Sequence, residues 1–221
     1  MAPGHVLFDL DGTLSDSAPG ILAALRHAFA VTGLPPMDAA TERSILGPPF
    51  YESLPPLIGD ERLPEVIAAY RAHYGDTTGG GGMFNTVAYP GVAELLADLR
   101  ADGVRLGVAT SKPEVYAIPI LEHLGLAQYF DTIGGDALDG SLGTKALVVG
   151  VVLERLGNPD PGDVVMVGDR SHDVLGARAH GVDCAAVTWG YAVPGELDAA
   201  APRWTCATAT EVAGVLRAPV L

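Results

Sequence analysis

Short apolar runs alternate with longer amphipathic stretches along this chain, and this alternation restricts its fold more than any other feature. The clearest runs hold β-branched or small residues between glycine or polar residues, and they cover residues 6–10, 104–110, 163–169 and 183–189. Such runs are typical of strands that are buried on both faces of a sheet. Residues 130–133 form a weaker candidate for a fifth strand.

The segments between these runs have the spacing of helices. Residues 92–100 place four apolar side chains on one helical face. Similar patterns predict helices over residues 116–124, 144–156 and 173–180. Strands that alternate with helices are joined by right-handed crossovers into a parallel sheet. The sequence therefore predicts an α/β fold whose core is a doubly wound, Rossmann-like parallel sheet.

The N-terminal part departs from this alternation, because no second strand-like run follows residues 6–10 until residue 104. Helical patterns occupy the interval instead, over residues 21–31, 39–45 and 64–74. We therefore expect a small α-helical cap domain of residues 17–86, inserted into a core domain of residues 1–16 and 87–221. The four glycines at 79–82 fit a hinge or a mobile loop better than a packed element.

Composition excludes several classes of partner. A formal net charge of -14 disfavours a nucleic acid polymer, because the protein would repel its phosphates. No apolar run approaches the roughly 18 residues of a membrane span. The first residues lack the basic and apolar blocks of a signal peptide, and the two cysteines have no disulfide or metal spacing, so we expect a cytoplasmic protein. A monomer and a homodimer are both compatible with the sequence.

Two carboxylates follow the first apolar run, in the motif DLDGT at residues 9–13. Asp9 and Asp11 would lie at the carboxyl edge of the sheet, where open α/β folds bind ligands. Either aspartate alone is also typical of a turn. The function of the pair therefore depends on what the other strand ends bring to the same edge.

The other strand ends supply hydroxyls, carboxylates and an ammonium group. The residues concerned are Thr110, Ser111, Lys145, Asp169 and Asp173. Carboxylates about 4 Å apart repel each other by ~4 kcal/mol at an effective dielectric constant near 20, so the acidic cluster requires a cation. Ligands that are all oxygen atoms favour Mg²⁺, which keeps room for water and a substrate phosphate. The pattern therefore predicts a magnesium-dependent phosphate site.

These motifs together resemble the haloacid dehalogenase-like hydrolases. The DLDGT motif, the strand-end Thr-Ser pair, the lysine that begins a helix and the GDRSHD motif occur in that family's order and approximate spacing. The resemblance covers nearly the whole chain. The helical insertion resembles the cap of the subgroup that includes phosphoglycolate phosphatases and β-phosphoglucomutase.

The resemblance implies a role for each of these residues. Asp9 is the nucleophile that forms an aspartyl-phosphate, and Asp11 is the general acid and base. Thr110, Ser111 and Lys145 bind the phosphate group.

The resemblance also implies a ligand set for Mg²⁺. Asp9, the backbone carbonyl of Asp11 and Asp169 bind the ion, and Asp173 binds it directly or through a water molecule. Arg43 in the cap is a candidate contact for a substrate carboxylate or second phosphate.

Several activities occur within this family, and the residues present separate some of them. The dehalogenases lack an acidic residue two positions after the nucleophile, whereas Asp11 is present here. A phosphonatase requires a lysine in the cap, but Lys112 and Lys145 are the only lysines of the chain. We expect a phosphatase that hydrolyses a small-molecule phosphate ester, resembling phosphoglycolate phosphatase. The alternatives are a 5'-nucleotidase acting on nucleoside monophosphates, a phosphomutase resembling β-phosphoglucomutase, and a signalling or binding protein phosphorylated on aspartate.

Overall fold

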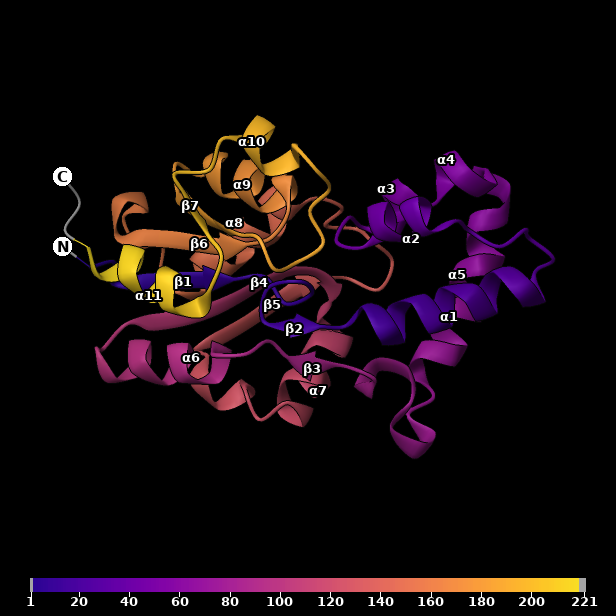
Figure 1. The fold of residues 1–221 in the computed structure, drawn as a ribbon, viewed down its shortest axis with the longest axis horizontal. Coiled ribbons are helices and arrows are strands. Elements are labelled where there is room, and N and C mark those ends of the chain that lie inside the picture. The colour runs from indigo at the N-terminus through magenta and orange to yellow at the C-terminus, as the bar shows by residue number, and fades with distance from the viewer. Residues whose placement is uncertain (1, 219–221) are drawn as a thin grey trace.

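A computed structural model describes residues 2–218 of the protein, and this part contains one parallel sheet of six strands (Figure 1). The strands lie in the order β5-β4-β1-β6-β7-β8. Their bounds are His5–Phe8 (β1), Arg105–Pro113 (β4), Thr132–Asp136 (β5), Val164–Gly168 (β6), Asp183–Val187 (β7) and Trp204–Cys206 (β8). This arrangement confirms the predicted α/β fold with a parallel sheet.

Helices cover both faces of the sheet. Successive side chains of a strand point to opposite faces, so each strand contributes to an apolar core on either side. Val6 and Phe8 of β1 belong to the apolar core beneath α6, α7 and α11, whereas Leu7 belongs to the core beneath α8 and α9. The bounds of these helices and of the shorter α10 are Val92–Ala101 (α6), Glu114–His123 (α7), Lys145–Arg155 (α8), Ser171–Arg178 (α9), Glu196–Ala200 (α10) and Ala209–Arg217 (α11).

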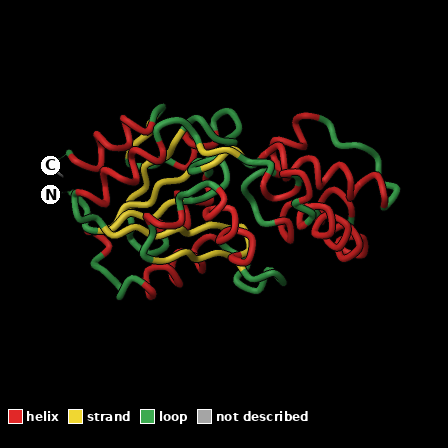
Figure 2. The backbone as a smooth tube through the Cα atoms, turned by 90° about the horizontal axis from the view of Figure 1, so that it is seen from below, coloured by secondary structure: helices red, strands yellow, loops and turns green. Residues whose placement is uncertain are grey.

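A second group of helices lies beside the sheet and belongs to residues 17–86, which we call the helical segment (Figure 2). Its α-helices are Ala18–Val31 (α1), Ala39–Ile45 (α2), Phe50–Ser53 (α3), Pro55–Ile58 (α4) and Leu63–Gly75 (α5). The longest two, α1 and α5, bury apolar side chains such as Leu25 and Val66 in a shared core. The chain enters and leaves this segment through β2 (Ser15–Asp16) and β3 (Val87–Ala88), which pair antiparallel.

The structure adds local detail to these expectations. The weaker candidate for a fifth strand is confirmed as β5, which begins at Thr132 rather than residue 130. The ring of Phe130 packs edge-on against Phe8 of β1. The pair β2–β3 and the strand β8 were not expected, since each has only two or three residues. The glycine run forms short 3₁₀ turns, in which Gly82 lies too close to the Tyr74 carbonyl for any side chain.

No helix within residues 2–218 combines the length and the apolar character needed to cross a membrane.

Candidate active site

The carboxyl ends of three neighbouring strands bring the predicted site residues together. Asp9 follows β1, Asp169 follows β6, and Thr110 lies within β4, on the other side of β1. The backbone N–H of Asp9 donates to the Val167 carbonyl at 2.9 Å, which extends the pairing of β1 with β6 as far as the candidate nucleophile. Asp9 is therefore held by the sheet itself rather than by a mobile loop.

A cluster of three buried carboxylates forms at this edge. Asp9, Asp169 and Asp173 each offer an oxygen, and these oxygens lie within 4.8 Å of one another. Lys145, the first residue of α8, places its Nζ 2.8 Å from an oxygen of Asp9 and 2.8 Å from an oxygen of Asp173. The same ammonium group donates to the Ala109 carbonyl at 3.0 Å. The buried ammonium group of Lys145 thus forms ion pairs with two of the three carboxylates.

The electrostatics of this cluster show an excess of negative charge. Burial raises the pKa of Asp169 well above its usual value, and the neighbouring carboxylates of Asp173 and Asp9 raise it further. Burial also raises the pKa of Asp173, although Lys145 opposes this effect. Burial alone would lower the pKa of Lys145, but its two carboxylate neighbours raise it above the usual value. A further cation would relieve the repulsion that remains.

The backbone around the carboxylates is shaped to fit them. A Cβ atom on Gly12 would lie 2.2 Å from Oδ2 of Asp169, and one on Gly190 would lie 2.3 Å from the same oxygen. A Cβ atom on Gly168 would lie 2.2 Å from Cγ of Asp173. Glycine at these positions lets the main chain approach the acidic groups closely. The carboxylate oxygens of this cluster form a set of donors without nitrogen or sulfur, and such a set fits a hard divalent cation such as Mg²⁺.

Asp11 has different surroundings from Asp9 although only two residues separate them. Its Oδ1 accepts a hydrogen bond of 2.5 Å from the Ser17 hydroxyl, and its Oδ2 lies 3.0 Å from Nζ of Lys112. The Lys112 ammonium also donates to the Tyr74 hydroxyl at 2.8 Å. Asp11 therefore faces the helical segment, while Asp9 faces the carboxylate cluster. Sequence reasoning missed the role of Lys112, although its position directly after Ser111 was a usable signal.

The Thr110-Ser111 pair lies beside these aspartates. Thr110 is buried, and its hydroxyl accepts a hydrogen bond of 3.2 Å from the Lys112 backbone N–H. The Ser111 hydroxyl is buried without a hydrogen-bond partner among the described residues. A buried hydroxyl without a partner is costly unless a ligand or water completes it. Ser111 is thus suited to bind an oxygen of a phosphate group.

A pocket lies between the helical segment and the core, with about 690 Å³ of empty space including the part that is open to solvent. Its core-side lining includes Asp11, Ser111 and Lys112. Arg43 does not line this pocket, contrary to expectation: it is exposed, and its guanidinium donates to the Ala192 carbonyl at 3.1 Å. Arg71 of α5 lines the pocket instead.

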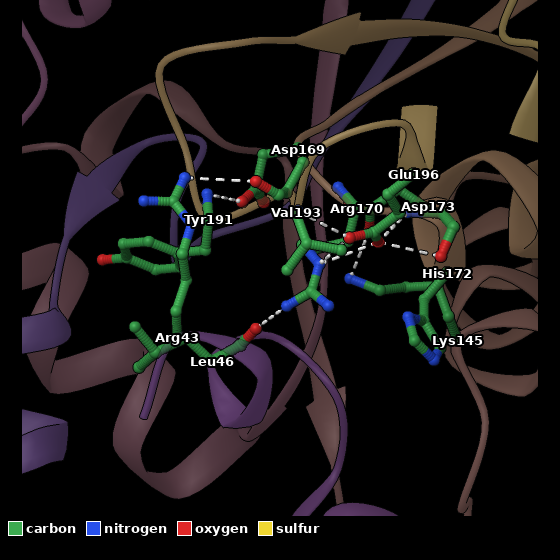
Figure 3. A network of polar contacts seen from close by, with 12 residues as sticks. Arg43, Leu46, Lys145, Asp169, Arg170, His172, Asp173, Tyr191, Val193 and Glu196 are labelled. Atoms are coloured by element: carbon green, nitrogen blue, oxygen red, sulfur yellow. Dashed lines mark hydrogen bonds and ion pairs between the residues drawn. The ribbon is translucent and has the colours of Figure 1, made fainter. Parts of the chain in front are cut away.

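A second layer of polar contacts supports the GDRSHD motif (Figure 3). The backbone N–H of Tyr191 donates to Oδ2 of Asp169 at 2.7 Å. Arg170 forms an ion pair of 2.8 Å with Glu196 and also donates to the Leu46 carbonyl in the helical segment. His172 lies at the same boundary, 3.9 Å from a carboxylate oxygen of Glu52. These contacts join the carboxyl edge of the sheet to the helical segment.

The chain is similar to several proteins of known or assigned activity. The chain is 48% identical over 190 residues to tyrosine-protein kinase PtkA of Mycobacterium tuberculosis, covering 86% of this chain and 64% of that protein. It is 35% identical over 214 residues to a 5'-nucleotidase of Pseudomonas aeruginosa, covering 96% of this chain and 95% of that protein. It is 34% identical over 203 residues to phosphoglycolate phosphatase 1 of the same organism, covering 86% and 71%. The chain thus spans less than two thirds of the length of PtkA.

Solved structures and a family model extend the comparison to the fold. The crystal structure of a predicted phosphatase from Clostridium acetobutylicum superimposes with a TM-score of 0.90 at 35% identity, covering 98% of this chain and 99% of that chain. The family model described as haloacid dehalogenase-like hydrolase matches residues 6–187, from β1 to the end of β7. The chain therefore belongs to the haloacid dehalogenase-like hydrolases.

Proposed function

We propose that the protein is a magnesium-dependent phosphatase that hydrolyses a small-molecule phosphate ester through an aspartyl-phosphate on Asp9. The observation that carries this proposal is the separation of two nearby aspartates into different surroundings. Asp9 lies in a buried cluster with Lys145, whereas Asp11 faces the pocket beside Lys112. Two carboxylates in such different surroundings can divide the work of nucleophile and acid–base catalyst.

The proposed reaction has two steps. An oxygen of Asp9 attacks phosphorus, the bond to the leaving oxygen breaks, and Asp11 donates a proton to that oxygen. Asp11 then takes a proton from a water molecule, whose oxygen attacks the same phosphorus and releases Asp9 and inorganic phosphate. Thr110, Ser111 and Lys145 hold the phosphate oxygens during both steps.

The proposed metal site uses the carboxylate cluster. Asp9, the Asp11 carbonyl and Asp169 would hold Mg²⁺, with Asp173 binding directly or through water. The ion would supply charge neutralisation for the phosphate and for the carboxylates around it. The raised pKa of Asp169 supports this assignment, because burial and the neighbouring carboxylates of Asp173 and Asp9 disfavour its charged form. The glycines support it as well, because they let the backbone approach the carboxylates closely.

We assign the helical segment, residues 17–86, as a cap over a core domain of residues 1–16 and 87–221. The pocket supports this division, since residues of both parts line it. Caps of this kind commonly exclude water and select the substrate. A cytoplasmic location and a monomeric or homodimeric state stay predictions from the sequence.

The relatives suggest two small substrates, a nucleoside monophosphate and phosphoglycolate, after the printed names of the two Pseudomonas proteins. A phosphomutase activity has less support, because it requires a second acid–base group in the cap, and the pocket-lining side of the helical segment carries no His, Asp or Glu among the described residues.

Phosphoryl transfer to tyrosine is a second candidate, favoured by the 48% identity to PtkA. A kinase would move the terminal phosphoryl group of ATP to a tyrosine hydroxyl, so incubation with γ-labelled ATP and Mg²⁺ would label protein. Release of all the label as inorganic phosphate, with none on protein, would favour hydrolysis over this candidate.

The nucleophile is tested by Asp9→Asn, assayed on p-nitrophenyl phosphate with Mg²⁺. We expect kcat to fall by about 10³-fold or more, because the covalent route is lost. The matched control is Asp98→Asn, which makes the same change at an exposed position on α6 and should leave kcat unaltered. Turnover close to that of the wild type by a folded Asp9→Asn protein would exclude the proposed mechanism.

A further inference from the structure

Aromatic side chains form a continuous row along one side of the pocket. Phe50 packs edge-on against Tyr70 with ring centroids 4.8 Å apart, and Tyr70 stacks on Tyr74 at 5.1 Å. Tyr74 in turn meets the edge of Tyr116 at 5.5 Å. All four line the pocket, three from the helical segment and Tyr116 from α7. We call these four residues the aromatic wall. Tyr70 and Tyr74 are buried and support the wall from behind, whereas Phe50 and Tyr116 are half-buried and offer the ring surface that a ligand can reach.

One residue of the aromatic wall, Tyr74, lies close to Asp11, the group assigned as general acid. The Tyr74 hydroxyl accepts a hydrogen bond of 2.8 Å from Lys112, and Lys112 lies 3.0 Å from Asp11. The Ser111 hydroxyl without a partner lies in the same pocket. An ester whose phosphate reaches Ser111 and whose leaving oxygen meets Asp11 would therefore extend its leaving group along these rings.

The charged groups of the pocket are already paired with protein atoms. Among the described residues its lining contains two cations, Lys112 and Arg71. Lys112 is engaged by Asp11 and Tyr74, as stated above, and Arg71 donates to the Leu138 carbonyl and to the Tyr51 hydroxyl. A leaving group that carries a carboxylate would share these cations with their present partners, and at Lys112 it would also be repelled by the carboxylate of Asp11. An uncharged flat ring instead gains by burial and by packing against aromatic faces and edges.

We propose that this pocket selects phosphate esters whose leaving group contains an uncharged planar aromatic ring, and that the aromatic wall is the surface which recognises it. The inference rests on the proposed function, because the phosphate must sit at Asp9 for the ring to reach the wall. It disfavours a two-carbon acid such as glycolate as the preferred leaving group. Benzyl or phenolic alcohols and nucleosides share the required chemistry.

The test compares benzyl phosphate with cyclohexylmethyl phosphate, which have the same carbon skeleton and a primary alcohol as leaving group. They differ in whether the ring is planar and aromatic. For the wild type with Mg²⁺ we expect kcat/KM to be about tenfold higher for benzyl phosphate, since aromatic contacts of this kind change affinity by several-fold each. Phosphoglycolate should have a lower kcat/KM than benzyl phosphate.

Two variants of the aromatic wall test whether its side chains cause the difference in kcat/KM between the two esters. Phe50→Leu and Tyr116→Leu should each bring the ratio of the two kcat/KM values down towards one, and the second variant serves if the first does not fold. Both side chains are only half-buried, so the change to leucine leaves most apolar contacts in place. The matched control is Phe84→Leu, whose ring stacks on His123 outside the pocket and whose loss should leave the ratio as in the wild type.

The outcomes separate this inference from the proposed function. Equal kcat/KM values for the two esters, or a higher value for phosphoglycolate, overturn the inference while hydrolysis that depends on Asp9 still stands. If none of the esters is hydrolysed, p-nitrophenyl phosphate included, the proposed function fails. Calorimetry then tests the aromatic wall separately: tighter binding of benzyl phosphate than of cyclohexylmethyl phosphate upholds the inference, and equal binding overturns it. Adenosine monophosphate forms a third arm, in which a kcat/KM above that of benzyl phosphate assigns the ring to a nucleoside and a lower value assigns it to an aryl alcohol.

Discussion

Lys112 lies 3.0 Å from Asp11, so that the second aspartate of the DLDGT motif is held by a buried ion pair. The other lysine of the chain, Lys145, lies 2.8 Å from the first aspartate, Asp9. Each lysine thus forms an ion pair with one of the two aspartates of the DLDGT motif. Lys112 also bonds Tyr74 of the helical segment, which couples the position of Asp11 to the position of that segment.

Replacing Lys112 by methionine should lower kcat by about 10- to 100-fold, because Asp11 loses the group that orients it towards the leaving oxygen. The variant removes one partner of a buried pair, so circular dichroism must first establish that it folds. Steady-state kinetics on p-nitrophenyl phosphate then gives kcat and KM separately.

The matched control is Arg26→Met, which breaks an exposed ion pair of 2.6 Å with Glu42. Exposed pairs contribute about 0–1 kcal/mol, so this variant should keep its activity. A folded Lys112→Met protein whose kcat stays within about twofold of the wild type would show that Lys112 does not orient Asp11.

Mg²⁺ should stabilise the folded protein, because it would relieve repulsion among Asp9, Asp169 and Asp173. An ion at about 100 times its Kd adds ~2.7 kcal/mol to the free energy of unfolding. The melting temperature of the wild type should therefore rise with Mg²⁺ concentration, and that of Asp169→Asn should rise much less. Scanning calorimetry measures both, with Asp98→Asn as the control. An equal rise in all three proteins would place the ion elsewhere.

The pair Arg170–Glu196 should make stability depend on pH in the acidic range. Burial alone would raise the pKa of Glu196, but hydrogen bonds from Arg170 and from the Ser171 and Val193 backbones outweigh it and lower the pKa to about 2. The carboxylate therefore stabilises the fold fully above its usual pKa of 4.5 and loses this effect as the pH falls towards 2.

The measurement is the difference in free energy of unfolding between the wild type and Glu196→Gln. This difference should be largest near about pH 6 and shrink towards about pH 3, because the carboxylate of the unfolded chain takes up its proton in this range before that of the folded protein does. A difference that stays constant across this range would mean that Glu196 contributes no charge-dependent stability.

Adding a methyl group at Gly190 should damage the metal site without altering any charged residue. A Cβ atom there would lie 2.3 Å from Oδ2 of Asp169 and 2.4 Å from the Gly12 carbonyl oxygen. Gly190→Ala should therefore displace Asp169 and raise the Mg²⁺ concentration needed for half-maximal activity.

The control is Gly214→Ala in α11, where an added Cβ meets no atom within 4 Å. That change should raise the free energy of unfolding by about 0.5–1 kcal/mol and leave the Mg²⁺ requirement unaltered. The same Mg²⁺ requirement in both variants would contradict the assignment of Asp169.

The fold and the residues at the sheet edge could be predicted because both depend on local patterns. The runs that became β1, β4, β6 and β7 are mostly apolar and buried, and a parallel sheet brings their carboxyl ends to one edge. Asp9 and Asp169 therefore meet wherever the loops run. No detailed packing was needed to foresee that meeting.

The pocket could not be predicted in the same way, because it depends on how the helical segment packs on the core. Arg43 was a reasonable candidate from its position in the segment, but α2 buries Ile45 and leaves Arg43 exposed. Lys112 of β4 pairs with Asp11 and also donates to the Tyr74 hydroxyl of α5, which holds the ammonium group between the core and the helical segment. Such contacts join residues far apart in the sequence and leave no periodic signal.

The pairing of β2 with β3 has a consequence for how such proteins diversify. Asp16 and Val87 are direct partners in this pair, so the two points where the chain leaves and rejoins the core are neighbours in space. A tight turn of a few residues can bridge such neighbours. The whole stretch between them is thus an interchangeable module, which can be shortened, exchanged or rebuilt while the register of the six-stranded sheet stays the same.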